Sequence, residues 1–165
     1  MRCINAETMY FSIGGHPAFR CPLEKGQSQT DYYFGFDIES RGNPKYHSIS
    51  RRGLYEPQEY ELPLEQGLYR LERGTFKKDT LIFEKQTTRV YLMRPDKRPY
   101  VTVTFAAPLF GIWSPPGKQA PFVCIEPWYG RCDREGFSGE IHEKDWIQSL
   151  APGEVFEAAY FMEFS

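Results

Sequence analysis

Phe122-Val-Cys-Ile-Glu126-Pro-Trp128-Tyr-Gly130 is the stretch that most clearly indicates a β-fold. Its apolar run is rich in β-branched and aromatic residues, which favour strands, and Gly130 closes it. Glu126 ends the apolar run directly before a proline. A carboxylate in that setting is expected to be partly desolvated, which raises its pKa and suits it to proton transfer. A Glu at a strand end is also often solvated or paired with an arginine, so the pattern by itself leaves both roles open.

The strand pattern extends over most of the chain. Apolar residues alternate with period two in the stretch 31–39, and similar short runs recur between turn signals. Strands are expected at 9–13, 31–39, 80–84, 89–93, 100–105, 109–113, 122–126 and 154–164. Turns are expected at 41–44, 94–99, 115–117 and 151–153, the last of them leading into a hairpin with the final strand. This arrangement predicts an all-β fold, an antiparallel β-sandwich.

Length and charge narrow the class of protein. The 165 residues suffice for a single domain, 1–165, with a sizeable core. A net charge of -2 provides no basic field for phosphates, so no nucleic-acid partner is expected. The sequence has no apolar run of about 18 residues and no signal-peptide core at its start, so we expect no membrane partner and a cytoplasmic location.

Metal-ligating residues are scattered along the chain. Four cysteines and three histidines show no CxxC or related spacing, so no metal site is expected and the thiols are expected to be reduced. Arg131, Asp133 and Arg134 are expected to form a rim of exposed ion pairs, each contributing little to stability.

A second marked segment, Phe11-Ser-Ile-Gly-Gly-His16-Pro-Ala-Phe19, contains one histidine between two glycines and a proline. The glycines allow the backbone to bend sharply or to approach a ligand, and Pro17 favours an extended conformation at His16. Histidine titrates near neutral pH, as a general acid requires. The alternative is a core histidine that holds a loop through one hydrogen bond.

Together, several segments resemble one family. The segments 11–19, 79–83, 109–114, 124–130 and 133–136, with the turn at 152–154, are similar to the aldose 1-epimerase (galactose mutarotase) superfamily, and most of all to its LacX-like branch. The resemblance implies an antiparallel β-sandwich of the galactose mutarotase-like (supersandwich) type. It covers only the C-terminal half of the family domain, so we expect a truncated half. The family's N-terminal half supplies sheet partners, a second active-site histidine and a sugar-contacting arginine.

The resemblance also implies a chemistry. Mutarotases interconvert the α and β anomers of a hexose by opening and closing the ring, and they use no cofactor because only protons move. By resemblance, Glu126 is the general base and His16 the general acid, while Asp79 accepts hydrogen bonds from sugar hydroxyls. Trp113 and Trp128 are candidates for packing on the sugar ring. For Asp79 a turn or cap role, and for the two tryptophans a core-filling role, remain open alternatives.

Three functions are therefore in competition. The first is an aldose 1-epimerase, an isomerase acting on a free hexose or a hexose phosphate. The second is a non-catalytic carbohydrate-binding module. The third is an inactive remnant that depends on self-association or on a partner supplying the N-terminal half.

Overall fold

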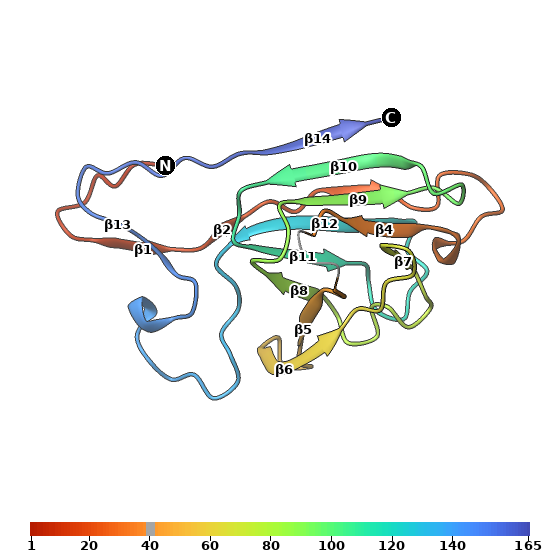
Figure 1. The fold of residues 1–165 in the computed structure, drawn as a ribbon. Helices are drawn as coiled ribbons and strands as arrows, with labels where there is room; N and C mark the ends of the chain where they lie inside the picture. Colours follow the sequence, from red (N-terminus) through yellow and green to blue (C-terminus); the bar gives the residue numbers. More distant parts are fainter. Residues whose placement is uncertain (39–41) are drawn as a thin grey trace.

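Two large β-sheets pack face to face in the computed structural model, which describes residues 1–38 and 42–165 (Figure 1). The first sheet has five strands in the order β14 (Tyr160–Phe164), β10 (Pro99–Phe105), β9 (Arg89–Met93), β4 (Tyr33–Phe36) and β7 (Leu68–Arg70). Neighbouring strands in this sheet are antiparallel. Figure 1 shows β14 running along the outer side of β10, so that β14 forms one edge of the sheet.

The second sheet has seven strands. Its order is β2 (Ile13–Gly14), β12 (Phe122–Tyr129), β11 (Leu109–Trp113), β8 (Leu81–Glu84), β5 (Lys45–Ile49) and β6 (Tyr55–Glu61), and β3 (Ala18–Arg20) also pairs with β12. A separate pair is formed by β1 (Met9–Phe11) and β13 (Gln148–Leu150). Two 3-10 turns, η1 (Gln29–Asp31) and η2 (Ile141–Glu143), complete the elements of the described residues.

The core lies between the two large sheets and is built from alternate residues of strands such as β10 and β12. On β10 these are Val101, Val103 and Phe105, and on β12 they are Val123 and Ile125, all of them buried. Burial of each such side chain stabilises the fold by about 1.5–3 kcal/mol. Because successive side chains of a strand point to opposite faces, the even-numbered residues of β12 are directed away from this core.

The predicted all-β antiparallel sandwich is confirmed, and each strand expected from periodicity has a counterpart among the described residues. Five strands were not expected: β3, β5, β6, β7 and β13. Strand β6 contains Pro57, which a strand pattern disfavours but which an edge strand tolerates. Glu39 and Arg41, which belong to an expected strand and an expected turn, lie outside the described residues.

The end of the chain differs from the expected hairpin. The turn at 151–154 is present, since the Glu154 N–H donates to the carbonyl of Ala151 at 3.0 Å. The chain then runs beside its own N-terminus, where the Cys3 N–H donates to the Glu154 carbonyl and the Phe156 N–H to the Met1 carbonyl. As a result β13 pairs with β1, and β14 begins only at Tyr160 and pairs with β10.

Within the parts of the chain that the structure describes, no helix combines the length and the apolar character needed to cross a bilayer.

Candidate active site

Glu126 lies on the outer face of the seven-stranded sheet, in the middle of β12. Its side chain is almost fully buried, although the residue carries an ionisable group. Directly across the strand pair on β11 is Gly111. A Cβ atom at Gly111 would lie 2.7 Å from ring atoms of Trp128, so the absence of a side chain there lets the Trp128 ring lie over β11. The carboxylate is thus covered by neighbouring side chains rather than by water.

His16 is brought to this carboxylate by backbone pairing. The Gly15 N–H donates to the Pro127 carbonyl at 2.9 Å and the Ile125 N–H to the Pro17 carbonyl at 3.4 Å, so the residues on both sides of His16 are held against β12. His16 Nδ1 lies 3.4 Å from Oε1 of Glu126. The His16 side chain is 62% exposed, whereas that of Glu126 is 5% exposed. One partner of the pair therefore faces solvent and the other is fixed in the fold.

The environment of Glu126 raises the pKa of its carboxyl group to about 6. Desolvation by burial is the main cause, because it disfavours the charged form. The charge of His16 and a hydrogen bond from the Trp128 side chain lower the pKa, while the charge of Asp79 raises it. A carboxyl group tuned in this way is ionised at neutral pH yet accepts a proton readily, as a general base does.

Asp79 lies directly before β8 with a left-handed backbone, φ 71°. Its Oδ1 accepts hydrogen bonds from the Thr80 N–H at 2.8 Å and the Thr80 hydroxyl at 3.0 Å. The local turn role that the sequence left open is therefore present. Asp79 is also close enough to Glu126 for its charge to raise the pKa of that group, so the folded chain brings this residue to the site as well.

The two tryptophans flank the pair. Trp113, at the end of β11, meets the His16 ring edge to face, with 5.8 Å between ring centroids. Trp128 lies between β2 and β11, since a Cβ at Gly14 would be 2.6 Å from its Cδ1 atom. The glycine at position 14 thus serves the packing of this indole ring. All five residues predicted for the site are gathered at one place on the sheet.

A hollow of about 340 Å³ opens beside the pair. His16, Glu126 and Trp128 contribute to its wall, and Asp79 and Trp113 do not. The volume is at the lower end of the range of about 300–1,000 Å³ that is usual for small-molecule sites. His16 and Glu126 thus border a space in which a small ligand can bind.

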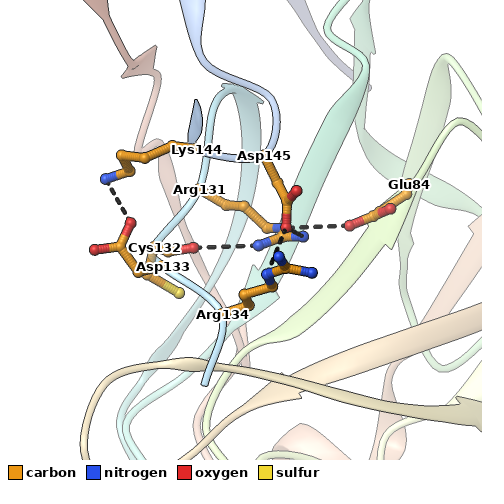
Figure 2. A network of polar contacts seen from close by, with 7 residues as sticks. All are labelled: Glu84, Arg131, Cys132, Asp133, Arg134, Lys144 and Asp145. Atoms are coloured by element: carbon orange, nitrogen blue, oxygen red, sulfur yellow. Dashed lines mark hydrogen bonds and ion pairs between the residues drawn. The ribbon is translucent and has the colours of Figure 1, made fainter. Parts of the chain in front are cut away.

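Arg131, which also lines the hollow, departs from the expected rim of exposed charges. Figure 2 shows its guanidinium between Glu84 and Asp145, at 3.2 and 3.0 Å. The Arg131 side chain is only 5% exposed, and its guanidinium carbon lies 3.5 Å from the centroid of the Tyr55 ring. No local sequence signal marks this residue as buried, because its partners come from distant parts of the chain.

The neighbouring ion pairs are peripheral, as expected. Asp133 pairs with Lys144 at 2.8 Å, and Arg134, whose side chain is largely exposed, approaches Asp145 at 4.0 Å (Figure 2). Together with Arg131, these pairs tie the segment after β12 to β8 and to the segment that follows η2. The network therefore fixes the part of the hollow's wall that Arg131 and Cys132 form.

Cys124 lies two residues before Glu126 and on the same face of β12. Its thiol is fully buried, and desolvation together with the charge of Glu126 raises its pKa to about 12. One ligand atom each from His16, Cys124 and Glu126 lies within 4.8 Å of the others. Imidazole, thiolate and carboxylate groups are all metal ligands, so these three side chains together have the chemistry to bind a metal ion.

Comparison with known proteins gives relatives of about twice this length. The chain is 30% identical over 158 residues to the plasmid-encoded protein LacX of Lactococcus lactis subsp. lactis, covering 93% of this chain and 52% of the relative. The chromosomal LacX of the same organism matches to the same extent. A scan against models of protein families finds no match.

Comparison with solved structures also gives relatives of about twice this length. The structure described as a galactose mutarotase related enzyme from Lactobacillus acidophilus superposes with a TM-score of 0.82 at 32% identity, over 97% of this chain and 53% of that one. A galactose mutarotase-like protein from Lactobacillus casei ATCC 334 shares the fold, with a TM-score of 0.79 at 23% identity over 98% of this chain and 54% of that one. The chain spans about half the length of the relatives it matches, which is consistent with their C-terminal half. These similarities relate the chain to LacX and to galactose mutarotase-like proteins, and they are consistent with the C-terminal half of an aldose 1-epimerase family domain.

Proposed function

We propose that the chain carries the proton-transfer part of an aldose 1-epimerase site, with Glu126 as general base and His16 as general acid. The proposal is supported above all by one observation: a buried carboxylate and an exposed imidazole lie 3.4 Å apart beside a hollow. An ionised Glu126 next to a protonated His16 is the charge state that the reaction needs at its start, and each charge stabilises the other.

The reaction uses only protons. The Glu126 carboxylate takes the proton from the C1 hydroxyl of the sugar while the His16 imidazolium donates a proton to the ring oxygen. The bond between C1 and the ring oxygen breaks, and the open-chain aldehyde forms. Rotation about C1–C2 presents the other face of the aldehyde, and the ring closes by the reverse transfers, which restores both residues. Asp79 and the two tryptophans would orient the sugar during these steps.

A free hexose suits the hollow better than a hexose phosphate. Among the described residues that line it, the basic ones are His16 and Arg131. The Arg131 guanidinium is already paired with two carboxylates, so it is not available to a phosphate group. We therefore expect a free sugar as substrate, because Glu84 and Asp145 neutralise the charge of Arg131.

The test is anomer exchange measured by NMR with α-glucose and α-galactose. The wild-type chain is expected to speed the exchange above the buffer rate, and Glu126→Gln should lower the enzymatic rate by about 10²–10⁴-fold, the usual contribution of a general base. Glu135→Gln, a change at an exposed glutamate, is the matched control and should leave the rate unchanged. Exchange no faster than in buffer would reject the enzyme function for this chain.

A second candidate function is sugar binding without turnover. It is favoured by the openness of the site, since His16 is mostly exposed. In this case the chain would bind hexose, as seen by calorimetry or by chemical-shift changes at Trp128, and Glu126→Gln would bind it equally well. Binding with no rate enhancement would select this function over the first.

We also propose that a β-rich partner, equivalent to the part of the relatives that this chain does not cover, pairs with β14. Its outer edge has no partner among the described strands, and the side chains of Phe161 and Phe164 are 69% and 67% exposed. Exposed apolar edge strands are sites of pairing with another chain.

Mixing the chain with the uncovered part of the Lactobacillus acidophilus relative tests this partner. A 1:1 complex in size-exclusion chromatography with light scattering is expected, and Phe161→Glu should abolish it. A homodimer of the chain alone, equally sensitive to Phe161→Glu, would assign β14 to self-association instead, and a stable monomer that binds no partner would reject the proposal.

A further inference from the structure

We propose that His16, Cys124 and Glu126 form a binding site for a zinc-type divalent ion, and that this ion occupies the acid–base pair. The three side chains come from two separate parts of the chain, and their ligand atoms lie within 4.8 Å of one another. The inhibitory consequence rests on the proposed function, whereas the binding site itself rests on the geometry alone.

The donor set defines the class of ion. A thiolate sulfur, an imidazole nitrogen and a carboxylate oxygen are all ligands of Zn²⁺, while Mg²⁺ and Ca²⁺ prefer oxygen ligands only. Zn²⁺ sites with three protein ligands keep a fourth position open for water or another small ligand. Here that position would face the hollow of about 340 Å³, because His16 and Glu126 form part of its wall.

The distances fit such a site with small adjustments. Tetrahedral coordination at the usual bond lengths places ligand atoms roughly 3.3–3.6 Å apart. The His16 Nδ1 and Glu126 Oε1 atoms, at 3.4 Å, already have this separation. The remaining separations, which are at most 4.8 Å, need to shorten by no more than about 1.5 Å.

The fold supplies two fixed ligands and one adjustable ligand. Cys124 and Glu126 are two residues apart on β12, so they project from the same face, and the pairing of Cys124 with Trp113 and with Ala18 holds the strand on both sides. The His16 side chain is 62% exposed, so it can change rotamer without disturbing the core. Burial disfavours a bare thiolate at Cys124, but a coordinated cation replaces the proton, which is released to solvent.

An ion at this site would block proton transfer. Coordination uses the Glu126 oxygen that would accept the proton and the His16 nitrogen that lies next to it. The chain would then be reversibly inhibited by Zn²⁺ and reactivated by a chelator.

The test uses the full chain, freed of metal by a chelator and then titrated with Co²⁺. We expect a 1:1 complex with the visible spectrum of a tetrahedral site and a thiolate-to-cobalt charge-transfer band in the near ultraviolet, both abolished by competing Zn²⁺. Cys124→Ser should remove the charge-transfer band. Cys132→Ser is the matched control, because Cys132 lines the same hollow and should leave the spectrum unchanged.

A second variant keeps the test valid if Cys124→Ser, a change at a buried position, fails to fold. His16→Gln changes an exposed side chain and should weaken Co²⁺ binding by at least about 10-fold, since even the loss of an outer-shell contact costs that much. The proposed site would be overturned if no 1:1 complex forms. It would also be overturned if the charge-transfer band persists in Cys124→Ser, or if His16→Gln leaves Co²⁺ binding unaffected.

The readout also separates this inference from the proposed function. Co²⁺ binding is measured without sugar, so a chain that binds the ion but does not catalyse anomer exchange would reject the enzyme function and keep the site. A chain that catalyses anomer exchange but binds no Co²⁺ would reject the metal site and keep the enzyme function.

Discussion

His16 Nδ1 and Glu126 Oε1 lie 3.4 Å apart, although 110 residues separate them in the sequence and one side chain is exposed while the other is buried. Backbone pairing of residues 15–17 with β12 creates this contact. The buried partner cannot relax into water when its charge changes, whereas the exposed partner can. Such an asymmetric pair can exchange protons with a ligand in the hollow while its geometry stays in place.

Burial of the Glu126 carboxyl group should lower the free energy of unfolding at neutral pH, where this group is ionised. Its pKa is about 6 in the folded protein, against an ordinary value of 4.5 in an unfolded chain, so the folded chain binds more protons between these values. The stabilisation from burying the neutral form is present below pH 4.5 and is lost as pH rises through about 6. Glu126→Gln stays neutral at every pH. Its stability relative to wild type should therefore grow from near zero in acid to about 1–2 kcal/mol above pH 6.

Urea unfolding of both proteins in chelator-containing buffer, at a series of pH values, measures this difference. A constant difference across the series would contradict the raised pKa.

Gly111 should be needed to keep Trp128 in place. A Cβ there would lie 2.7 Å from the indole ring, so Gly111→Ala must displace the ring or the strand, at a cost of about 1–3 kcal/mol. Gly74→Ala is the control, because its Cβ would meet nothing within 4 Å, and it should change stability by less than about 0.5 kcal/mol. Thermal unfolding gives the stability, and a change in the tryptophan emission spectrum reports the ring. Equal effects of the two substitutions would show that the contact is unimportant.

Arg131 should stabilise the wall of the hollow far more than its neighbour Arg134. Arg131→Met leaves Glu84 half-buried and without its cation, which we expect to cost about 2–3 kcal/mol after allowance for the partial exposure of both carboxylates. Arg134→Met removes one long, exposed contact and should cost less than about 1 kcal/mol. Chemical denaturation of the two variants provides the comparison, and a reversed order would refute the buried role of Arg131.

Asp79 should tune Glu126 as well as contact the sugar. Because its charge raises the pKa of the Glu126 carboxyl group, Asp79→Asn should lower that pKa and move the acidic limb of the kcat/KM profile to lower pH. The base must be ionised to act, so the variant would retain activity in more acidic buffer than the wild type does. Anomer exchange followed from pH 4 to pH 8, with chelator present, measures the limb. An unshifted limb accompanied only by a higher KM would restrict Asp79 to substrate binding.

Much of the fold follows from local pattern. The period of two in the stretch 100–105 reflects strand geometry, and the continuous apolar run 122–126 is typical of a strand that is buried on both faces, so those elements and the all-β antiparallel class were predictable. The strands that were missed have weak or interrupted patterns. In β6 the residues after Tyr55 are largely polar and include Pro57, because the strand lies at a sheet edge and buries little.

The sequence by itself determined the strand class and the marked segments around Glu126 and His16, because these depend on residue type and near neighbours. The set of five candidate residues came from the resemblance of those segments to a family. Only the tertiary structure decided which distant residues meet. It placed His16 against Glu126 and brought Cys124 beside them. It also laid Trp128 over Gly111 and buried Arg131 between Glu84 and Asp145. Register and sheet packing set these contacts. A scattered set of histidine, cysteine and glutamate positions therefore predicts no metal site in the sequence, yet forms one group of ligand atoms once strand pairing closes the distance.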